Sequence, residues 1–562
     1  EPKMSSKNID LVNLRQTLFA LLKPERSFFA VVIAYSVVIG LLTLAVPIAV
    51  QTLINTIANI ASTRAVATLA IVLFSTLLLS GCFAALRMRV MEYYERRIYA
   101  RLVADLSLRT ILAPHSYFEG NQNTSITHRY FDIMTLQKNV PSLMVDGIAL
   151  ILQMIVGFTL VSFYHPFLLA FNLCVILIMY IIWRLWSTQA KITAVRLSES
   201  KYSTAKWLSN LASANDFLKS SSQFDYAGKK TERYVSEYND IHAKHFSFTF
   251  KQVVMFLVLY ALASSALLGL GGWLVIDGQL SIGQLVAAEL IMAAVFLGLS
   301  NFSHYLKLYY ELYGTADKIG GVISMPQEAY EQTSKPAPVG GSLNFNNVII
   351  KRKDESCLIN KNIAQGNKYF VTTQSNWTQR TIVNLLKRYE TPASGWINLD
   401  NNDLSDYDTY DLRQAVFVLD RSLIIECTIE EYIKMCAPDV STNEINDTLE
   451  KVGLTVVINA LPHKLKTAIS AVGTPLQPLE FILLKLVVVM LSKPKVLVIN
   501  QHFDAIPTSR RERILRVIEA TDLTVLYFSN APSNDFLDGT ISLQSKKEPP
   551  LSSAPLQENS HE

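Results

Sequence analysis

Six long apolar runs constrain this chain more than any other feature of its sequence. They lie at about 28–50, 65–86, 145–164, 167–186, 253–276 and 282–302. Each is about long enough to cross the roughly 30 Å of hydrocarbon in a bilayer as a helix. His165-Pro166 and the stretch "DGQLS" separate two pairs of runs, and both are expected to be tight turns. The sequence therefore predicts a membrane α-helical domain with six transmembrane helices and the lipid bilayer as a partner.

Basic residues are distributed unevenly between the two sides of these spans. Lys and Arg crowd the segment before the first run and the stretch after the second, from Arg87 to Arg109. The alternate connections hold almost none. Because Lys and Arg near span ends stay on the cytoplasmic side, both termini are expected in the cytoplasm. The predicted location is a multi-pass plasma membrane, the inner membrane in a bacterium.

The remainder of the chain differs from the spans in composition and in its hydrophobic pattern. We expect a cytoplasmic amino-terminal segment at 1–27, the membrane domain at 28–325, a linker at 326–341, an α/β domain at 342–544 and a disordered tail at 545–562. Short β-rich runs such as "VLVIN" alternate with helical ones in 342–544, which predicts a mostly parallel sheet covered by helices. "SRRE", from Ser509 to Glu512, has the spacing of a helix capping box.

Composition excludes several classes of function. Half of the residues are hydrophobic and the formal net charge is only +4, so nucleic-acid binding is not expected. None of the five cysteines has the spacing of a zinc site, and no metal centre is expected. Inside the predicted spans, Glu289 is the exceptional carboxylate; a place on a transport path, a helix contact and a misplaced helix end all remain open. Asp504 is expected to be an exposed loop carboxylate rather than a metal ligand.

Six spans followed by one α/β domain resemble an ABC exporter half-transporter, a type-1 transmembrane domain fused to a nucleotide-binding domain of the P-loop NTPase type. "HSYFEG" at His115 to Gly120, "NLLKRYETPASGWINLD" at Asn384 to Asp400 and "SKPKVLVIN" are similar to family segments. "HSYFEG" resembles in particular the exporters of type I protein secretion and bacteriocin export.

The resemblance places the Walker A phosphate loop on Thr373 to Thr381, "TQSNWTQRT". The glycine positions of such a loop, which need positive φ and close approach to phosphate, fall on Thr373, Asn376 and Thr378. The lysine position is Gln379 and the magnesium-binding hydroxyl is Arg380; a shift of one residue would use Arg380 and Thr381 instead and restores no glycine.

The other family motifs are also altered. The Walker B carboxylate and the catalytic glutamate fall on Asn500 and Gln501, the loop glutamine on Asp420 and the switch histidine on Asn530. An amide is a poor magnesium ligand and no general base. The signature motif falls on five residues that lack its glycines and serine: Leu476, Gln477, Pro478, Leu479 and Glu480.

The resemblance thus implies a degenerate, ATPase-dead nucleotide-binding domain that binds no ATP or Mg²⁺. We expect a non-hydrolysing scaffold, regulatory or conduit subunit of an export or secretion system, acting as a homodimer with possible secretion accessory proteins as partners. Two alternatives stay open. One is an ATP-driven exporter with an unconventional nucleotide site; the other is the degenerate half of a heterodimer with another ABC half-transporter.

Overall fold

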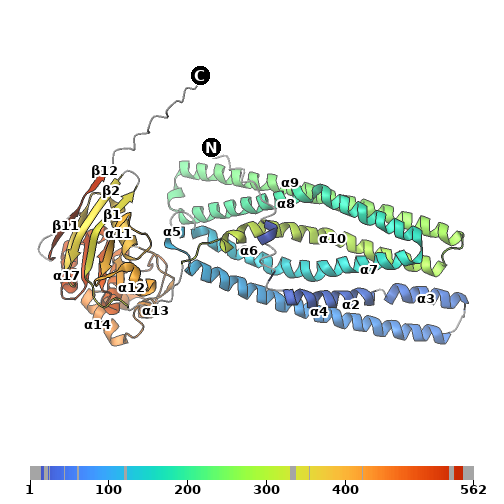
Figure 1. Cartoon of the computed structure of the whole chain (residues 1–562), viewed down its shortest axis with the longest axis horizontal. Coiled ribbons are helices and arrows are strands. Elements are labelled where there is room, and N and C mark those ends of the chain that lie inside the picture. Colours follow the sequence, from blue (N-terminus) through green and yellow to red (C-terminus); the bar gives the residue numbers. More distant parts are fainter. Residues whose placement is uncertain are drawn as a thin grey trace, which may run out of the picture. The chain divides into compact units, whose positions relative to one another are not determined.

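The protein divides into a helical unit, Glu1–Glu328, and an α/β unit, Ala329–Glu562. The computed structural model describes residues 14–17, 23, 26–43, 45–59, 63–118, 123–328, 337–352, 355–420, 422–530 and 537–547. Most of the predicted segment 1–27, the middle of the linker and most of the tail lie outside the described residues. The predicted fold class, a membrane α-helical domain plus an α/β domain, is confirmed (Figure 1).

Long helices make up the first unit. They are α2 (Arg26–Thr43), α3 (Ala45–Asn59), α4 (Thr63–Ile111), α5 (His115–Phe118), α6 (Asn123–Ser142), α7 (Ile148–Tyr164), α8 (Pro166–Ser213), α9 (Ser221–Ile276) and α10 (Ile282–Ile323). A π-helical turn, η2 (Leu143–Gly147), joins α6 to α7 directly after Pro141, whose missing N–H breaks the regular ladder. A short 3-10 helix, η3 (Phe217–Lys219), lies between α8 and α9.

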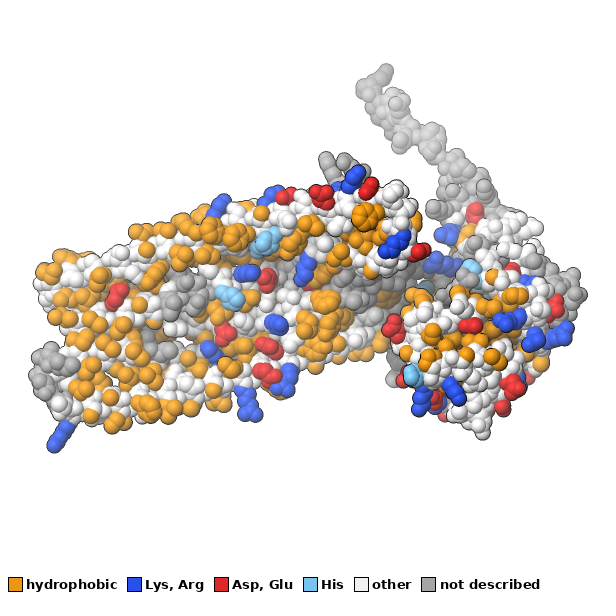
Figure 2. Space-filling model, turned by 180° about the vertical axis from the view of Figure 1, so that it is seen from behind, with side chains coloured by type: hydrophobic (Ala, Val, Ile, Leu, Met, Phe, Trp, Pro, Cys, Tyr) orange, Lys and Arg blue, Asp and Glu red, His pale blue; other side chains and the backbone are white. Residues whose placement is uncertain are grey.

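Five helical stretches are long and apolar enough to cross a membrane in the part of the chain that the structure describes. They are Ile33–Thr56, Thr63–Ile111, Arg129–Tyr164, Pro166–Ser213 and Ser221–Ile276, with a shorter apolar helix at Ile282–Phe296. Figure 2 shows hydrophobic side chains covering one end of these helices, whereas charged side chains gather toward the other end. The long helices therefore have a membrane-compatible portion and a water-compatible portion.

The two tight turns predicted between apolar runs are confirmed. At the first, Pro166 begins α8, and His165 Nδ1 accepts a hydrogen bond from the Phe167 N–H at 3.2 Å. At the second, Gly278 adopts φ +74° and Ser281 caps α10 through a reciprocal pair of hydrogen bonds with Gln284. In the first turn the His165 side chain accepts a backbone N–H. In the second, Gly278 has no Cβ and therefore adopts a positive φ without strain.

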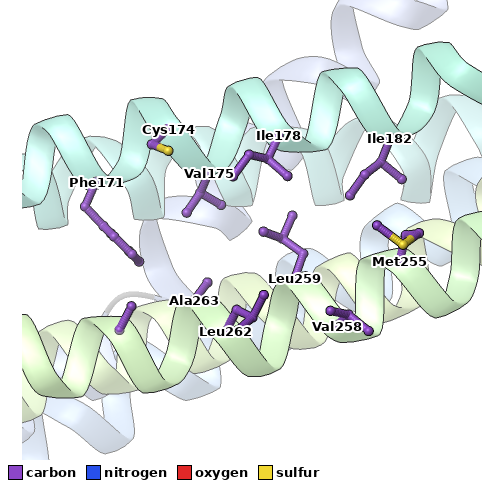
Figure 3. Close-up of a pocket in the computed structure, with 11 residues that line it drawn as sticks. Phe171, Cys174, Val175, Ile178, Ile182, Met255, Val258, Leu259, Leu262 and Ala263 are labelled. Carbon is purple, nitrogen blue, oxygen red and sulfur yellow. The ribbon is translucent and has the colours of Figure 1, made fainter.

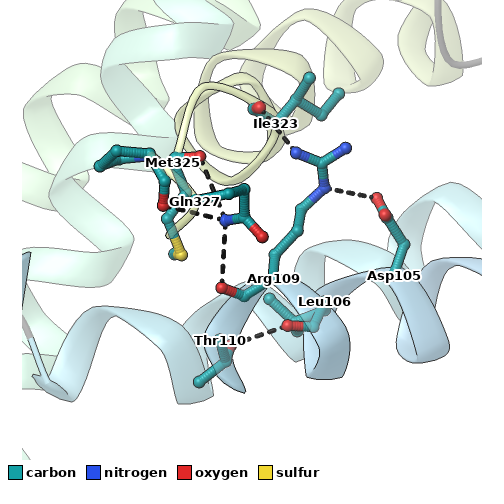
Figure 4. A network of polar contacts seen from close by, with 8 residues as sticks. Asp105, Leu106, Arg109, Thr110, Ile323, Met325 and Gln327 are labelled. Atoms are coloured by element: carbon teal, nitrogen blue, oxygen red, sulfur yellow. Dashed lines mark hydrogen bonds and ion pairs between the residues drawn. The ribbon is translucent and has the colours of Figure 1, made fainter. Parts of the chain in front are cut away.

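A polar network joins the carboxyl ends of α4 and α10 (Figure 4). Arg109 donates from Nη1 to the Ile323 carbonyl at 2.9 Å and from Nε to the Asp105 carboxylate at 2.9 Å. Gln327 Nε2 donates in return to the Arg109 carbonyl at 3.2 Å. Each side chain thus satisfies a carbonyl that the end of the other helix leaves without a partner. The two ends are held together where the chain leaves the helical unit.

A five-stranded parallel sheet organises the second unit. Its order is β11-β3-β10-β9-β6. The strands are β3 (Lys368–Thr373), β6 (Val416–Leu419), β9 (Val496–Ile499), β10 (Thr524–Phe528) and β11 (Gly539–Leu543). All four residues of β9 are fully buried, as predicted for the "VLVI" run of a parallel strand covered on both faces.

A second, antiparallel sheet and several helices complete the unit. The sheet has the order β12-β2-β1-β4-β5, from β1 (Leu343–Arg352), β2 (Glu355–Ile363), β4 (Ser394–Leu399), β5 (Asn402–Asp403) and β12 (Ser545–Lys547). A two-stranded sheet pairs β7 (Cys427–Thr428) with β8 (Ala468–Ile469). The α-helices are α11 (Asn376–Leu386), α12 (Thr409–Ala415), α13 (Ile429–Cys436), α14 (Thr442–Val452), α15 (Thr455–Ala460), α16 (Pro478–Ser492) and α17 (Thr508–Glu519).

The capping box predicted at Ser509 to Glu512 is wrong. Helix α17 already begins at Thr508, and Pro507 occupies the N-cap position, so Ser509 is the second helical residue. The Pro507 carbonyl accepts from the N–H groups of Arg510 and Arg511 at 3.0 and 2.9 Å. The N–H of an N-cap residue has no carbonyl partner within the helix, so a proline is tolerated there. Helix α17 can therefore start at Thr508, directly after Pro507.

Candidate functional site

Four of the predicted motif positions come together at one edge of the parallel sheet. Thr373 ends β3, Asp420 follows β6, Asn500 follows β9, and Asn530 lies two residues beyond β10. Since β3, β10, β9 and β6 are neighbours and all parallel, their carboxyl ends share an edge. In open α/β sheets ligands bind outside this edge. These four positions therefore lie along the edge of the sheet where ligands bind in such folds.

The segment from β3 to α11 occupies the place expected for a phosphate loop. Only Gln374 and Ser375 separate the last residue of β3 from the first residue of α11. The Thr373 hydroxyl donates to the Ser375 carbonyl at 3.1 Å, which closes this short connection. From Thr373 to Thr381, where the structure describes every backbone position, no residue has positive φ. The helix begins three residues before Gln379.

Side chains of the first turns of α11 pack into the unit. Thr378 and Gln379 are buried, whereas Arg380 is exposed on the helix and Thr381 is partly buried. No described residue hydrogen-bonds Gln379 Nε2. Trp377 Nε1 donates to the Glu355 carboxylate at 2.6 Å and fixes the start of the helix to β2. The position expected for a phosphate-binding lysine is thus a buried amide.

The Asn500 amide after β9 is engaged with its own backbone. Asn500 is the N-cap of a short 3-10 helix, η6 (Gln501–Ala505), and its Oδ1 accepts from the His502 N–H at 3.0 Å. Gln501 is the first residue of that helix. The carbonyl oxygen that could face a cation is therefore used to start a turn, as Asn often does at such positions.

Asp504 is the central acceptor of this edge, and the expectation of an exposed loop carboxylate is wrong. Its carboxylate accepts from Tyr527 Oη at 2.5 Å, Ser529 Oγ at 3.1 Å and the Asn530 N–H at 3.1 Å. Arg511 from α17 lies 3.9 Å from Oδ1. Burial and the neighbouring carboxylate raise the pKa of Tyr527. A signal in the sequence was the pair of hydroxyls at the end of β10, since buried hydroxyls need acceptors.

The signature positions start helix α16. Leu476 is buried, Pro478 is the first helical residue, and the Gln477 N–H donates to the Glu480 carboxylate at 2.7 Å. Proline contributes no N–H, and the carboxylate of the first turn occupies the donor before it. The helix terminus is thus closed by its own side chains instead of presenting free N–H groups to an anion.

Lys485 links α16 to the position of the loop glutamine. Its side chain is almost fully buried, and Nζ donates to the carbonyls of Asp420 and Ser422 at 3.1 and 2.7 Å. Burial lowers the pKa of Lys485, and the Asp420 carboxylate, 3.7 Å away, opposes that shift. Sequence reasoning missed this contact, although one lysine inside the apolar run "FILLKLVVVML" signals a buried partner.

The connection between β3 and α11 differs from a phosphate loop in its length and composition. A phosphate loop presents successive backbone N–H groups from a glycine-rich turn, whereas here the strand leads into the helix after two residues. Within the described ranges, no group of three or more His, Cys, Asp or Glu residues could hold a metal ion.

One further predicted residue lies elsewhere. Glu289 is in α10 of the helical unit, where it is partly buried, and no described residue hydrogen-bonds its Oε2.

The helical unit matches a known family. Residues 29–299 match the ABC transporter transmembrane region. Together with the C-terminal α/β unit and the similarity to secretion exporters, this match supports an ABC exporter half-transporter.

Its relatives include translocation proteins of toxin secretion. The chain is 22% identical over 448 residues to the leukotoxin translocation ATP-binding protein LktB of Mannheimia haemolytica. The aligned residues cover 78% of this chain and 62% of the relative. The chain is 23% identical over 254 residues to the alpha-hemolysin translocation ATP-binding protein HlyB of Proteus vulgaris, covering 44% and 36%. These matches span less than two thirds of the relatives' length.

Proposed function

We propose that this protein is a pseudo-ATPase subunit of an export or secretion system, acting as a scaffold, regulatory partner or passive conduit rather than as an ATP-driven pump. The observation that carries the proposal is the two-residue connection between β3 and α11. A triphosphate is held by a curled loop of N–H groups, and a strand that enters a helix at once offers none.

Chemistry at the neighbouring positions supports the same proposal. Asn500 and Gln501 supply neutral amides where magnesium binding and proton abstraction need carboxylates. Loss of a general base alone typically lowers a rate by about 10² to 10⁴. Gln379 is buried and cannot reach a phosphate without leaving its pocket. We therefore expect no ATP or Mg²⁺ cofactor and no ATP hydrolysis.

The composite nature of the family's ATP sites extends the argument to a partner. In this family each site combines the Walker A motif of one subunit with the signature motif of the other. The Gln477 N–H is already bound to Glu480, and Pro478 has none, so this chain would also impair its partner's site. We favour a homodimer, because one half-transporter does not enclose a path, with secretion accessory proteins as further partners.

Location and path belong to the same proposal. The basic residues flanking the spans favour a plasma membrane protein with both termini and the α/β unit in the cytoplasm. Glu289, a carboxylate inside the apolar part of α10 with one oxygen unpartnered among the described residues, is the candidate for a transport path.

A nucleotide-binding titration on the purified full chain tests the proposal. We expect neither saturable binding of Mg²⁺-ATP up to millimolar concentration nor phosphate release. One control is the leukotoxin translocation ATP-binding protein LktB, and the other is a variant of this chain with Asn500→Asp and Gln501→Glu. Saturable micromolar binding by the unmodified chain would overturn the proposal in favour of an unconventional transporter. ATPase activity that appears only with a co-purified motif-complete half-transporter would favour the heterodimer.

A further inference from the structure

An apolar groove runs between α8 and α9 in the membrane-compatible part of the helical unit. Its volume is about 230 Å³, and every residue that lines it is apolar. Figure 3 shows side chains of both helices pointing into it. The floor consists of buried Val175, Ile182, Leu259 and Ala263.

Small side chains create the groove. Cys174, Ala263 and Ala266 lie on the lining where larger side chains would close the space between the helices. Cys174 and Ala266 are also exposed, so the groove opens to the surroundings of the helix pair. In a membrane-spanning segment those surroundings are acyl chains, which can fill an apolar furrow without losing hydrogen bonds.

The length of the groove fits one leaflet. From Phe171 to Ile182 the helix rises about 17 Å at 1.5 Å per residue, compared with roughly 15 Å for half of the hydrocarbon thickness. On α9 the lining begins at Met255. Lys251 lies four residues before it, on the same helix face, and is exposed. A cation therefore stands just beyond one end of the groove.

We propose that the groove is a binding site for an anionic phospholipid of the bilayer. One acyl chain fills the furrow between α8 and α9, and Lys251 pairs with the phosphate of the headgroup. Lys251 Nζ lies 5.8 Å from the centre of the Phe248 ring and remains exposed, so it is available to a second anionic partner. In the orientation proposed above, this lipid belongs to the cytoplasmic leaflet.

Native mass spectrometry of the full chain, titrated in detergent with phosphatidylglycerol or phosphatidylcholine, tests this proposal. We expect at least one tightly retained phosphatidylglycerol. Ala266→Trp, which fills the groove, should abolish that retention, whereas Ala261→Trp, an exposed alanine of α9 outside the groove, should not. Lys251→Gln should reduce the preference for phosphatidylglycerol about fivefold. Lys251→Arg should keep the preference, and Lys244→Gln, the same change two turns away, should leave it intact.

Three outcomes would overturn the proposal. The first is equal lipid retention by the Ala266→Trp and Ala261→Trp proteins. The second is retention without any headgroup preference in the unmodified protein. The third is efficient crosslinking of Cys174 between two copies by a short bismaleimide in membranes, since it would show that a second copy covers the groove. These readouts do not depend on nucleotide binding, so their failure is distinct from failure of the pseudo-ATPase proposal.

Discussion

Replacing Asp504 should loosen the edge of the parallel sheet where a nucleotide would otherwise bind. Asp504→Ala removes the acceptor of Tyr527, Ser529 and the Asn530 N–H and the counter-ion of Arg511. Tyr527 and Ser529 are almost fully buried, so water cannot easily replace the lost acceptor. The substitution therefore removes the carboxylate that accepts from the buried Tyr527 hydroxyl.

The magnitude follows from these contacts. Hydrogen bonds to a charged group contribute about 1.5 to 3 kcal/mol each, but they are not additive in one cluster. The Asp504 side chain is 21% exposed, which lets solvent screen part of its charge. We expect a loss of about 3 to 4 kcal/mol in the free energy of unfolding for Asp504→Ala. Asp504→Asn, which keeps one acceptor oxygen, should lose about 1 to 2 kcal/mol.

A double-mutant cycle with Tyr527→Phe provides the assay. Thermal unfolding of the full chain in detergent should show a fall of the transition of the α/β unit by about 10 °C for Asp504→Ala, at about 2 to 4 °C per kcal/mol. Once the carboxylate is gone, Tyr527→Phe should cost nothing more, because it removes an orphaned hydroxyl. Hydrogen exchange of the 524–530 segment localises the effect. Simple additivity of the two substitutions, or a shift of less than about 2 °C, would refute this reasoning.

Three further expectations concern the same unit. Lys485→Met should speed amide exchange across 420–428 by about tenfold, measured by mass spectrometry, because two carbonyls lose their buried donor; unchanged exchange contradicts the link. Gly473→Ala should lower the free energy of unfolding of the unit, measured in urea, by about 2 to 4 kcal/mol, because Gly473 has φ +93° and a Cβ there would lie 2.4 Å from Phe481. Gly453→Ala should lower it by only about 1 kcal/mol, because Gly453 has φ +80° but open space around it. Because the folded pKa of Tyr527 is raised, stability should fall as pH rises above about 10. Tyr527→Phe should weaken this dependence without removing it, because burial also raises the pKa of Tyr432.

Much of the fold could be predicted because periodicity reports burial directly. The "VLVI" run could only be a strand covered on both faces, and β9 is fully buried. Length and apolarity identified the membrane helices in the same way. Helix starts were harder to predict. Ser509 matched a capping-box spacing, yet the chain begins α17 one residue before it, since Pro507 already ends the preceding turn.

The candidate site was predictable in place but not in its contacts. Parallel strands bring their carboxyl ends to one edge, so the register of Asn500, Asp420 and Asn530 follows from topology. Which side chains would pair there depends on positions far apart in sequence. Lys485 reaches Asp420 across 65 residues, and Asp504 accepts from residues more than 20 positions later. No local pattern encodes such pairs.

Residues at and beside the changed motif positions form hydrogen bonds within the domain, and these bonds help to keep it folded. An edge that evolved around a charged ligand would leave donors and acceptors exposed to solvent when that ligand is lost. Here Asn500 starts its own turn, Glu480 closes the terminus of α16, and Asp504 gathers the groups at the end of β10. Each bond is intramolecular and independent of any ligand. If the proposed function holds, we expect a domain built in this way to keep its shape at every nucleotide concentration, as a subunit that supports an assembly requires.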